Sequence, residues 1–287
     1  MHLVPKHISL PTTRESLDEF RQRTQRFSER RLKLFRQFFL FPNATASPLF
    51  ILGVQRSGTN SLFDMLDESL SVLTYNEHNP VAFDNYRIRD AAARQQLINR
   101  AHCEWVAFKP ICDVQHAAEL LDSHAGGKAI WIFRHYTDVA NSAINKWGRG
   151  QYHHIERLAM VDNCTHWFCE NVDPDTRALI NHFFLAGISD HEAGILKWYV
   201  RNQWFFTLKL FERRDHVLLI QYEDLVRDSA SIGQKVFDFL NVRFDPRYVD
   251  HFHEYSIRKS DFPAIKPEIQ ELCDDLLQKL IREAHKA

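Results

Sequence analysis

One short stretch of the chain combines glycines, hydroxyl side chains and a cation in the order of a phosphate-binding loop. An apolar run at 49–54 leads into a turn and then a helical pattern. A strand that turns into a helix in this way points backbone N–H groups and the positive end of the helix at one spot, which makes an anion site. We therefore expect the turn to bind a phosphate or sulfate. Its residues are Arg56, Ser57, Gly58, Thr59, Asn60 and Ser61.

The turn departs from the nucleotide triphosphatase pattern GxxxxGK[ST]. Gly53 and Gly58 match its two glycines. However, Thr59 stands in place of the phosphate-binding lysine, and Asn60 in place of the hydroxyl that binds Mg²⁺. Arg56 supplies a cation instead, so the turn favours an anion that needs no metal.

This turn resembles the 5′-phosphosulfate loop of the sulfotransferase family, a strand followed by (K/R)SGT(T/N)xL. The resemblance implies 3′-phosphoadenosine 5′-phosphosulfate (PAPS) as co-substrate, with residues 56–61 around its 5′-phosphosulfate and no metal. It also implies a P-loop NTPase-like α/β fold, with a mainly parallel central sheet flanked by helices. Asn60 replaces the commoner threonine, but an amide still donates hydrogen bonds.

A second signature of the family begins at Arg134. The family's 3′-phosphate motif has an Arg at a strand end, an Asp-Val pair and a Ser eight residues after the Arg. Arg134, Asp138-Val139 and Ser142 match it, so the resemblance implies that Arg134 and Ser142 bind the 3′-phosphate. An arginine also offers the forked donor that suits a phosphate. His135-Tyr136 stands where the family has Asp-Pro.

Two further matches extend the resemblance to residues 49–260. The first is Tyr222-Glu223-Asp224-Leu225, which we interpret as structural because acids at a helix start favour the helix dipole. The second is Arg258-Lys259, which resembles the basic loop that closes on the 3′-phosphate. A solvated basic turn is the alternative interpretation of Arg258 and Lys259.

Sulfuryl transfer needs a base for the acceptor proton and a cation beside the leaving oxygen. The family uses either a His two residues after a strand-end Lys, or a Glu about twenty residues beyond the phosphate loop. Here Lys109 is present, but Ile111 occupies the His position. The resemblance therefore implies Glu77 as base, with Arg56 and Lys109 stabilising the leaving oxygen. His78 is a reserve base and His116 a third candidate, and Glu77 as an ordinary loop carboxylate remains the alternative.

The surrounding pattern alternates between strands and helices. We expect buried strands at 49–54, 105–108, 129–133 and 216–221, and helices at 61–70, 135–147 and 229–240. Such alternation indicates right-handed crossovers in a mainly parallel sheet. Residues 150–211 show helical pattern only and are expected to cap the sheet. We predict one α/β domain over 48–287.

The segment 1–47 differs from the rest of the chain. It holds nine Lys and Arg against four Asp and Glu. Apolar residues recur at helical spacing, so we expect a helix over about 17–39, ended by Pro42. This helix either packs on the core or extends from it. Its basic amphipathic stretch, 14–39, is a candidate contact for a membrane surface or an anionic partner.

Composition narrows the classes of protein. The chain has 287 residues, a formal charge of −1 and 45% hydrophobic residues, which indicates a globular protein and disfavours a general nucleic-acid binder. Five scattered cysteines favour buried, reduced thiols. The absence of a long apolar run or signal-peptide core favours a cytoplasmic location. The His and Cys residues at 153–169 fit no zinc template.

Together these patterns predict a metal-independent sulfotransferase. The acceptor hydroxyl would lie on a glycan or other carbohydrate, a lipid, a small molecule or a peptide tyrosine. The oligomeric state cannot be derived from the residues. Two alternatives stay open: a P-loop kinase-like phosphoryl transferase, and a non-catalytic nucleotide-binding protein.

Overall fold

Five parallel strands form the central sheet, in the spatial order β2-β5-β1-β6-β7. The computed structural model describes residues 17–250, 252 and 263–286, with side chains from residue 28 onward. The strands are β1 (Ser47–Gly53), β2 (Val72–Tyr75), β5 (Trp105–Phe108), β6 (Lys128–Phe133) and β7 (Val217–Gln221). All four neighbouring pairs are parallel, as the strand–helix alternation predicted.

Both faces of the sheet are buried, which explains why its strands read as continuous apolar runs. In β1, Leu49 and Ile51 pack into one hydrophobic cluster, and Phe50 and Leu52 into the other. All four side chains are fully buried. The core therefore lies in two layers, one on each side of the sheet.

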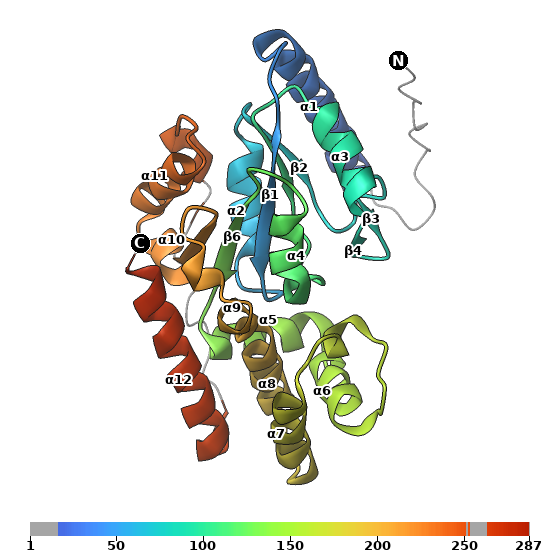
Figure 1. Cartoon of the computed structure of the whole chain (residues 1–287), viewed down its shortest axis with the longest axis vertical. Coiled ribbons are helices and arrows are strands. Elements are labelled where there is room, and N and C mark those ends of the chain that lie inside the picture. The colour runs from blue at the N-terminus through green and yellow to red at the C-terminus, as the bar shows by residue number, and fades with distance from the viewer. Residues whose placement is uncertain (1–16, 251, 253–262, 287) are drawn as a thin grey trace.

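Helices cover the two faces. The Leu49 side is covered by α2 (Thr59–Asp67), α10 (Tyr222–Arg227) and α11 (Ser229–Phe239). The cluster on the Phe50 side includes residues of several helices, among them four longer ones and the short α9 (Trp204–Thr207). These four are α4 (Ala117–Asp122), α5 (Tyr136–Trp147), α8 (Asp190–Asn202) and α12 (Pro267–Ala284). Figure 1 shows α12 running alongside α8.

Residues 150–211 contain helices and no strand, as expected. They form α6 (Gly150–Met160), η2 (Trp167–Cys169), α7 (Pro174–Leu185), α8, α9 and η3 (Leu210–Glu212). A capping box starts α8, because Ser189 and Glu192 each accept a hydrogen bond from the other's backbone N–H. Figure 1 places α6, α7 and α8 together beyond one end of the sheet.

The residue pattern did not predict β2 or the small hairpin of β3 (Phe83–Asp84) and β4 (Arg87–Ile88). A four-residue strand carries little periodicity, and Val72-Leu73 is its only apolar pair. Helix α3 (Ala91–Asn99) follows the hairpin, and its N-cap Asp90 accepts a hydrogen bond from the Ala93 N–H at 2.8 Å. The strand β2 matters for function because Glu77 follows it.

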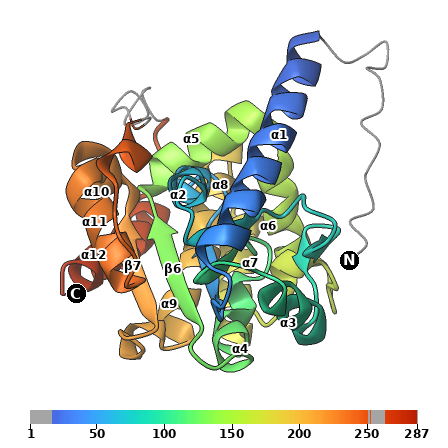
Figure 2. The ribbon, with the colours of Figure 1, turned by 90° about the horizontal axis from the view of Figure 1, so that it is seen from above.

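Helix α1 (Leu17–Leu40) forms as the apolar spacing predicted and lies along the sheet edge formed by β2. Buried Gln37 donates to the carbonyl oxygens of Leu70 and Val72, at 2.9 and 3.3 Å. Figure 2 shows the first turns of α1 standing out from the rest of the molecule.

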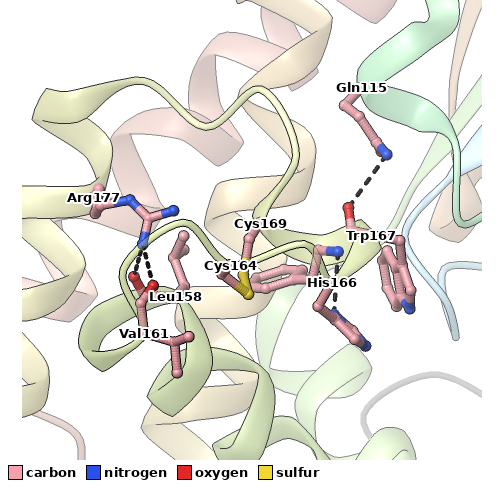
Figure 3. Close-up of a disulfide and its surroundings, with 9 residues drawn as sticks. Gln115, Leu158, Val161, Cys164, His166, Trp167, Cys169 and Arg177 are labelled. Atoms are coloured by element: carbon pink, nitrogen blue, oxygen red, sulfur yellow. Dashed lines mark hydrogen bonds between the residues drawn. A yellow bond between two sulfur atoms is a disulfide. The ribbon is translucent and has the colours of Figure 1, made fainter.

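The expectation of five reduced cysteines is wrong for two of them. Cys164 and Cys169 form a disulfide, with Cα atoms 5.9 Å apart (Figure 3). Cys103, Cys112 and Cys273 are free and buried. Sequence spacing alone misses such a pair, because bonding depends on how the connection between α6 and α7 turns back on itself. This pair is therefore not the reduced pair of thiols that a reducing compartment would favour.

The disulfide closes a small loop that contains η2. Gln115 donates to the Trp167 carbonyl oxygen at 3.3 Å, and Arg177 donates to the carbonyl oxygen of Leu158 (Figure 3). We expect Cys164→Ala with Cys169→Ala to lower the free energy of unfolding by about 2 kcal/mol, the loop-closure entropy of so short a ring. Thermal unfolding of oxidised wild type against the double variant measures this. Cys103→Ala is the control, and an equal loss in both variants would contradict the assignment to the disulfide.

Candidate active site

The loop after β1 has the backbone geometry of an anion site. Gly53 and Gly58 have φ of 143° and 94°, which favour glycine. A Cβ at Gly58 would lie 2.1 Å from the Tyr222 ring, so no larger residue fits there. Gly58 is also the N-cap of α2 and provides no side-chain cap. The first-turn N–H groups of α2 therefore keep their capacity to bind an anion.

The loop and the second signature meet, although they are far apart in the sequence. Arg56 Nε donates to Ser142 Oγ at 2.9 Å. Because β1 and β6 are neighbours in a parallel sheet, the segments that follow them share one edge. A cavity of about 330 Å³ lies between them. Its lining includes Arg56, Gly58, Thr59, Asn60, Ser61, Arg134 and Ser142.

Arg134 is fixed from several sides. Its Nη2 lies 3.2 Å from Asp138 Oδ2, and its guanidinium stands over the Tyr222 ring, 4.9 Å from the centroid. Trp198 of α8 donates to the Arg134 carbonyl oxygen at 2.8 Å. Glu223 accepts a hydrogen bond from the N–H of His135 at 2.9 Å. The last two contacts fix the backbone and the first two orient the guanidinium, so ligand binding would cost little side-chain entropy.

Tyr222 is a cavity residue that the residue pattern assigned to structure. It lines the cavity, packs against Gly58 and lies beneath Arg134. The sequence could have indicated this, because Tyr222 directly follows β7. In a parallel sheet, the residues that follow the strands line the ligand-binding edge. Asn141 and Asn145 of α5 also line the cavity and were not anticipated.

The electrostatics of the cavity favour an anion. Burial, followed by the nearby positive charge of Arg134, lowers the pKa of Arg56 from its ordinary value. Two close cations of low exposure disfavour each other's charge, and an anion between them would relieve that cost. The buried hydroxyl of Ser57 has no hydrogen-bond partner among the described residues. This leaves a donor in the loop for such an anion.

Glu77 and Lys109 form a buried ion pair beside the loop. Lys109 Nζ lies 2.9 Å from Glu77 Oε2, and their side chains are 4% and 9% exposed. Lys109 Nζ also donates to Asn60 Oδ1. Tyr75 and Phe108 are paired in the register of β2 and β5, so Glu77 and Lys109 follow neighbouring strands. Asn60 therefore connects the cavity to the ion pair.

Neither reserve base lines the 330 Å³ cavity. His78 is 66% exposed, and its Nδ1 is 3.8 Å from Glu77 Oε1. His116 lies 3.1 Å from both Glu119 and Glu170, at a second cavity of about 360 Å³. Burial alone would raise the pKa of Glu170, but hydrogen bonds from Arg87, Gln115 and His116 bring it to about 2. His116 therefore belongs to a separate polar network.

Arg201 of α8 supports the segment that follows Lys109. It is fully buried and donates to the Ile111 carbonyl oxygen and to Gln115 Oε1, both at 2.8 Å. Its guanidinium lies 5.0 Å from the centroid of Trp167, the residue within the disulfide loop. Ile111 stands where some family members have a histidine, and here its carbonyl oxygen accepts a hydrogen bond from Arg201.

Arg258 and Lys259 lie outside the described residues. Among residues 17–250, 252 and 263–286, no group of three metal-ligating side chains gathers. None of the helices in that part of the chain is both long and apolar enough to cross a membrane.

Comparison with known families identifies the class of this protein. The family model described as "Sulfotransferase domain" matches residues 46–261. The chain belongs to the sulfotransferase family and is an enzyme of that class. The match spans the phosphate loop, the ion pair and the Arg134 signature. A search of curated proteins gave no match.

Several solved structures resemble the chain at low identity. The sulfotransferase domain of a Synechococcus olefin synthase is 16% identical, with a TM-score of 0.47 over 82% of this chain and 96% of that one. A sulfotransferase from Alicyclobacillus acidocaldarius is 16% identical, with a TM-score of 0.48 over 84% and 94%. A mouse sulfotransferase complexed with PAP (3′-phosphoadenosine 5′-phosphate) is 14% identical. Its TM-score is 0.41, over 87% of this chain and 89% of that one.

Proposed function

We propose that this chain transfers a sulfuryl group from PAPS to an acceptor hydroxyl without a metal. The observation that carries the proposal is the Arg56–Ser142 hydrogen bond, which joins the two family signatures at one cavity. A donor with a 5′-phosphosulfate and a 3′-phosphate has two anionic ends. The loop at 56–61 and the Arg134–Ser142 segment offer one cationic site for each end.

The residues present fit that donor. Arg56, Ser57 and the first-turn N–H groups of α2 would bind the 5′ end, and Arg134 with Ser142 the 3′-phosphate. In a P-loop nucleotide triphosphatase, the residue at position 60 binds Mg²⁺. Here Asn60 Oδ1 accepts a hydrogen bond from the Lys109 ammonium. The Lys109 ammonium is therefore the cation beside residue 60, where a P-loop nucleotide triphosphatase has Mg²⁺.

The ion pair supplies the two chemical roles. Bound PAPS would supply an activated sulfuryl group. Lys109 would stabilise the negative charge that grows on the leaving phosphate oxygen, because an ammonium in a water-poor site acts strongly. Glu77 would accept the proton of the acceptor hydroxyl. Lys109 also holds Glu77 in place, so the base and the cation are positioned together.

Several classes of acceptor suit the proposed base. Hydroxyls of a glycan, a lipid or a small molecule all suit the proposed base, and a peptide tyrosine suits it equally. The location that we propose is the cytoplasm. The three buried free thiols, Cys103, Cys112 and Cys273, favour it, and the Cys164–Cys169 disulfide counts against it.

Binding of the desulfated product, 3′-phosphoadenosine 5′-phosphate (PAP), tests the proposal without an acceptor. We expect micromolar affinity in calorimetry without Mg²⁺. Arg134→Ala should weaken binding by about 10–100-fold, the worth of charge-assisted hydrogen bonds to a phosphate. Wild type should bind AMP, which lacks the 3′-phosphate, about as weakly as the variant binds PAP.

Controls separate this proposal from its alternatives. Arg213→Ala removes an arginine paired with Asp122 at the surface, and it should leave PAP binding unchanged. Equal binding of PAP and AMP would exclude the 3′-phosphate site. Turnover of ATP that requires Mg²⁺ would instead favour the kinase-like alternative. PAP binding with no transfer to any acceptor would favour a non-catalytic binding protein.

A further inference from the structure

Helix α1 turns its polar side chains toward the protein. Lys33 Nζ lies 2.9 Å from Asp67 Oδ1, and Arg30 donates to the Thr74 carbonyl oxygen at 3.1 Å. Gln37 reaches the other end of β2. These contacts show that α1 runs antiparallel to β2, because Arg30 meets the end of the strand and Gln37 its start. Over residues 28–40, the inner face of α1 is therefore hydrophilic, the reverse of an ordinary packed helix.

Six large apolar side chains near the end of α1 are exposed. The side chains concerned are 39–62% exposed and lie within three turns of helix. They are Leu32, Leu34, Phe35, Phe38, Phe39 and Leu40, which we call the outer stripe. Phe35 and Phe39 contact each other edge to face, with centroids 4.7 Å apart. A contiguous apolar patch of this kind on a protein surface marks an interaction site.

Basic side chains accompany the outer stripe. Arg30 and Lys33 face the protein, whereas Arg31 and Arg36 are exposed among the residues of the outer stripe. The single acid between residues 28 and 40 is Glu29. Aromatic and leucine side chains interspersed with arginines are the composition of helices that lie in the interface of an anionic membrane.

A second copy of the chain fits the outer stripe poorly. Symmetric pairing of two outer stripes would bring Arg31 and Arg36 of both copies together, which is repulsive.

We propose that the outer stripe of α1 docks on an anionic lipid surface, with the helix lying on the membrane and not across it. The start of α1 lies on the side where β2 ends, and its first turns project beyond the rest of the molecule (Figure 2). Glu77 follows β2 on that same side. The outer stripe itself lies beside the start of β2, where Gln37 contacts Leu70 and Val72, so docking would hold the opposite edge of the sheet near the membrane and leave Glu77 on the side facing away.

Vesicle sedimentation of the full chain tests the proposal. Vesicles of phosphatidylcholine alone are compared with vesicles containing about 30% phosphatidylserine, at low and high salt. We expect binding to the anionic vesicles that weakens with salt. Phe35→Gln with Phe39→Gln should weaken it at least tenfold, and Arg36→Gln roughly fivefold. Leu185→Gln, at a site 67% exposed on α7, should leave binding unchanged.

The outcomes are distinct because all four positions are exposed and the substitutions should leave thermal unfolding unchanged. Loss of binding in the Phe double variant with retention in Leu185→Gln would support the proposal. No sedimentation of wild type with anionic vesicles would overturn it. So would concentration-dependent dimerisation that the Phe variant abolishes, because a second copy would then be the occupant. PAP binding should be the same in all variants, so this test does not depend on the proposed activity.

Discussion

Glu77→Gln should lower the rate of sulfuryl transfer by about 10²–10⁴-fold, the usual contribution of a general base. Glutamine keeps the size of the side chain but cannot accept the acceptor proton. PAP affinity should stay near that of wild type, because Glu77 is not among the residues that line the 330 Å³ cavity. The rate is measured as PAP release from PAPS with a panel of hydroxyl acceptors, and the affinity by calorimetry.

The matched control is His78→Gln. His78 is exposed, and its Nδ1 lies 3.8 Å from the Glu77 carboxylate. The variant therefore tests whether any change beside this carboxylate lowers the transfer rate. We expect His78→Gln to retain most of the activity. The opposite ranking of the two variants would make His78 the base and would leave Glu77 with a supporting role.

Lys109→Met should damage both catalysis and stability. Loss of the cation near the leaving oxygen is expected to lower kcat by about 10²–10³-fold. The substitution also leaves the buried Glu77 carboxylate without its partner, and breaking a buried pair in this way costs about 3–5 kcal/mol. Activity assays and urea unfolding measure the two effects on the same preparation.

A double variant separates the two effects of Lys109. In Glu77→Gln with Lys109→Met no buried charge remains at this position, so most of the lost stability should return while activity does not. If the double variant is as unstable as Lys109→Met alone, the loss comes from packing or from the Asn60 contact. If Lys109→Met alone keeps full activity, Lys109 is a structural residue and the leaving oxygen depends on Arg56.

The strands and the phosphate loop were predictable because their signals are local. The run 49–54 is apolar, and Gly58 sits where only glycine fits against Tyr222. The Glu77–Lys109 contact could not be derived this way, because it depends on β2 and β5 being neighbours. The strand β2 itself was missed, and the family resemblance alone indicated Glu77.

Other parts of the site needed tertiary structure for a different reason. In the sequence, Tyr222 looks like an ordinary first residue of a helix. Only the tertiary structure shows that its ring contacts Gly58 and lies beneath Arg134. The Cys164–Cys169 disulfide depends on the course of an irregular connection, which no periodic pattern describes. The polar inner face of α1 over residues 28–40 could not be predicted from the sequence either, because an amphipathic helix normally packs through its apolar side.

The central place of β1 in the sheet also governs how the chain can fold. It is the earliest strand in the sequence, yet its partners β5 and β6 are supplied by distant segments, and β7 joins only after residues 150–211. Such pairing loses loop entropy before it gains contacts, so folding is slow. During that time both hydrogen-bonding edges of β1 remain unpaired, and its apolar side chains remain exposed. The sheet that builds the anion site therefore makes the unfinished chain prone to aggregation.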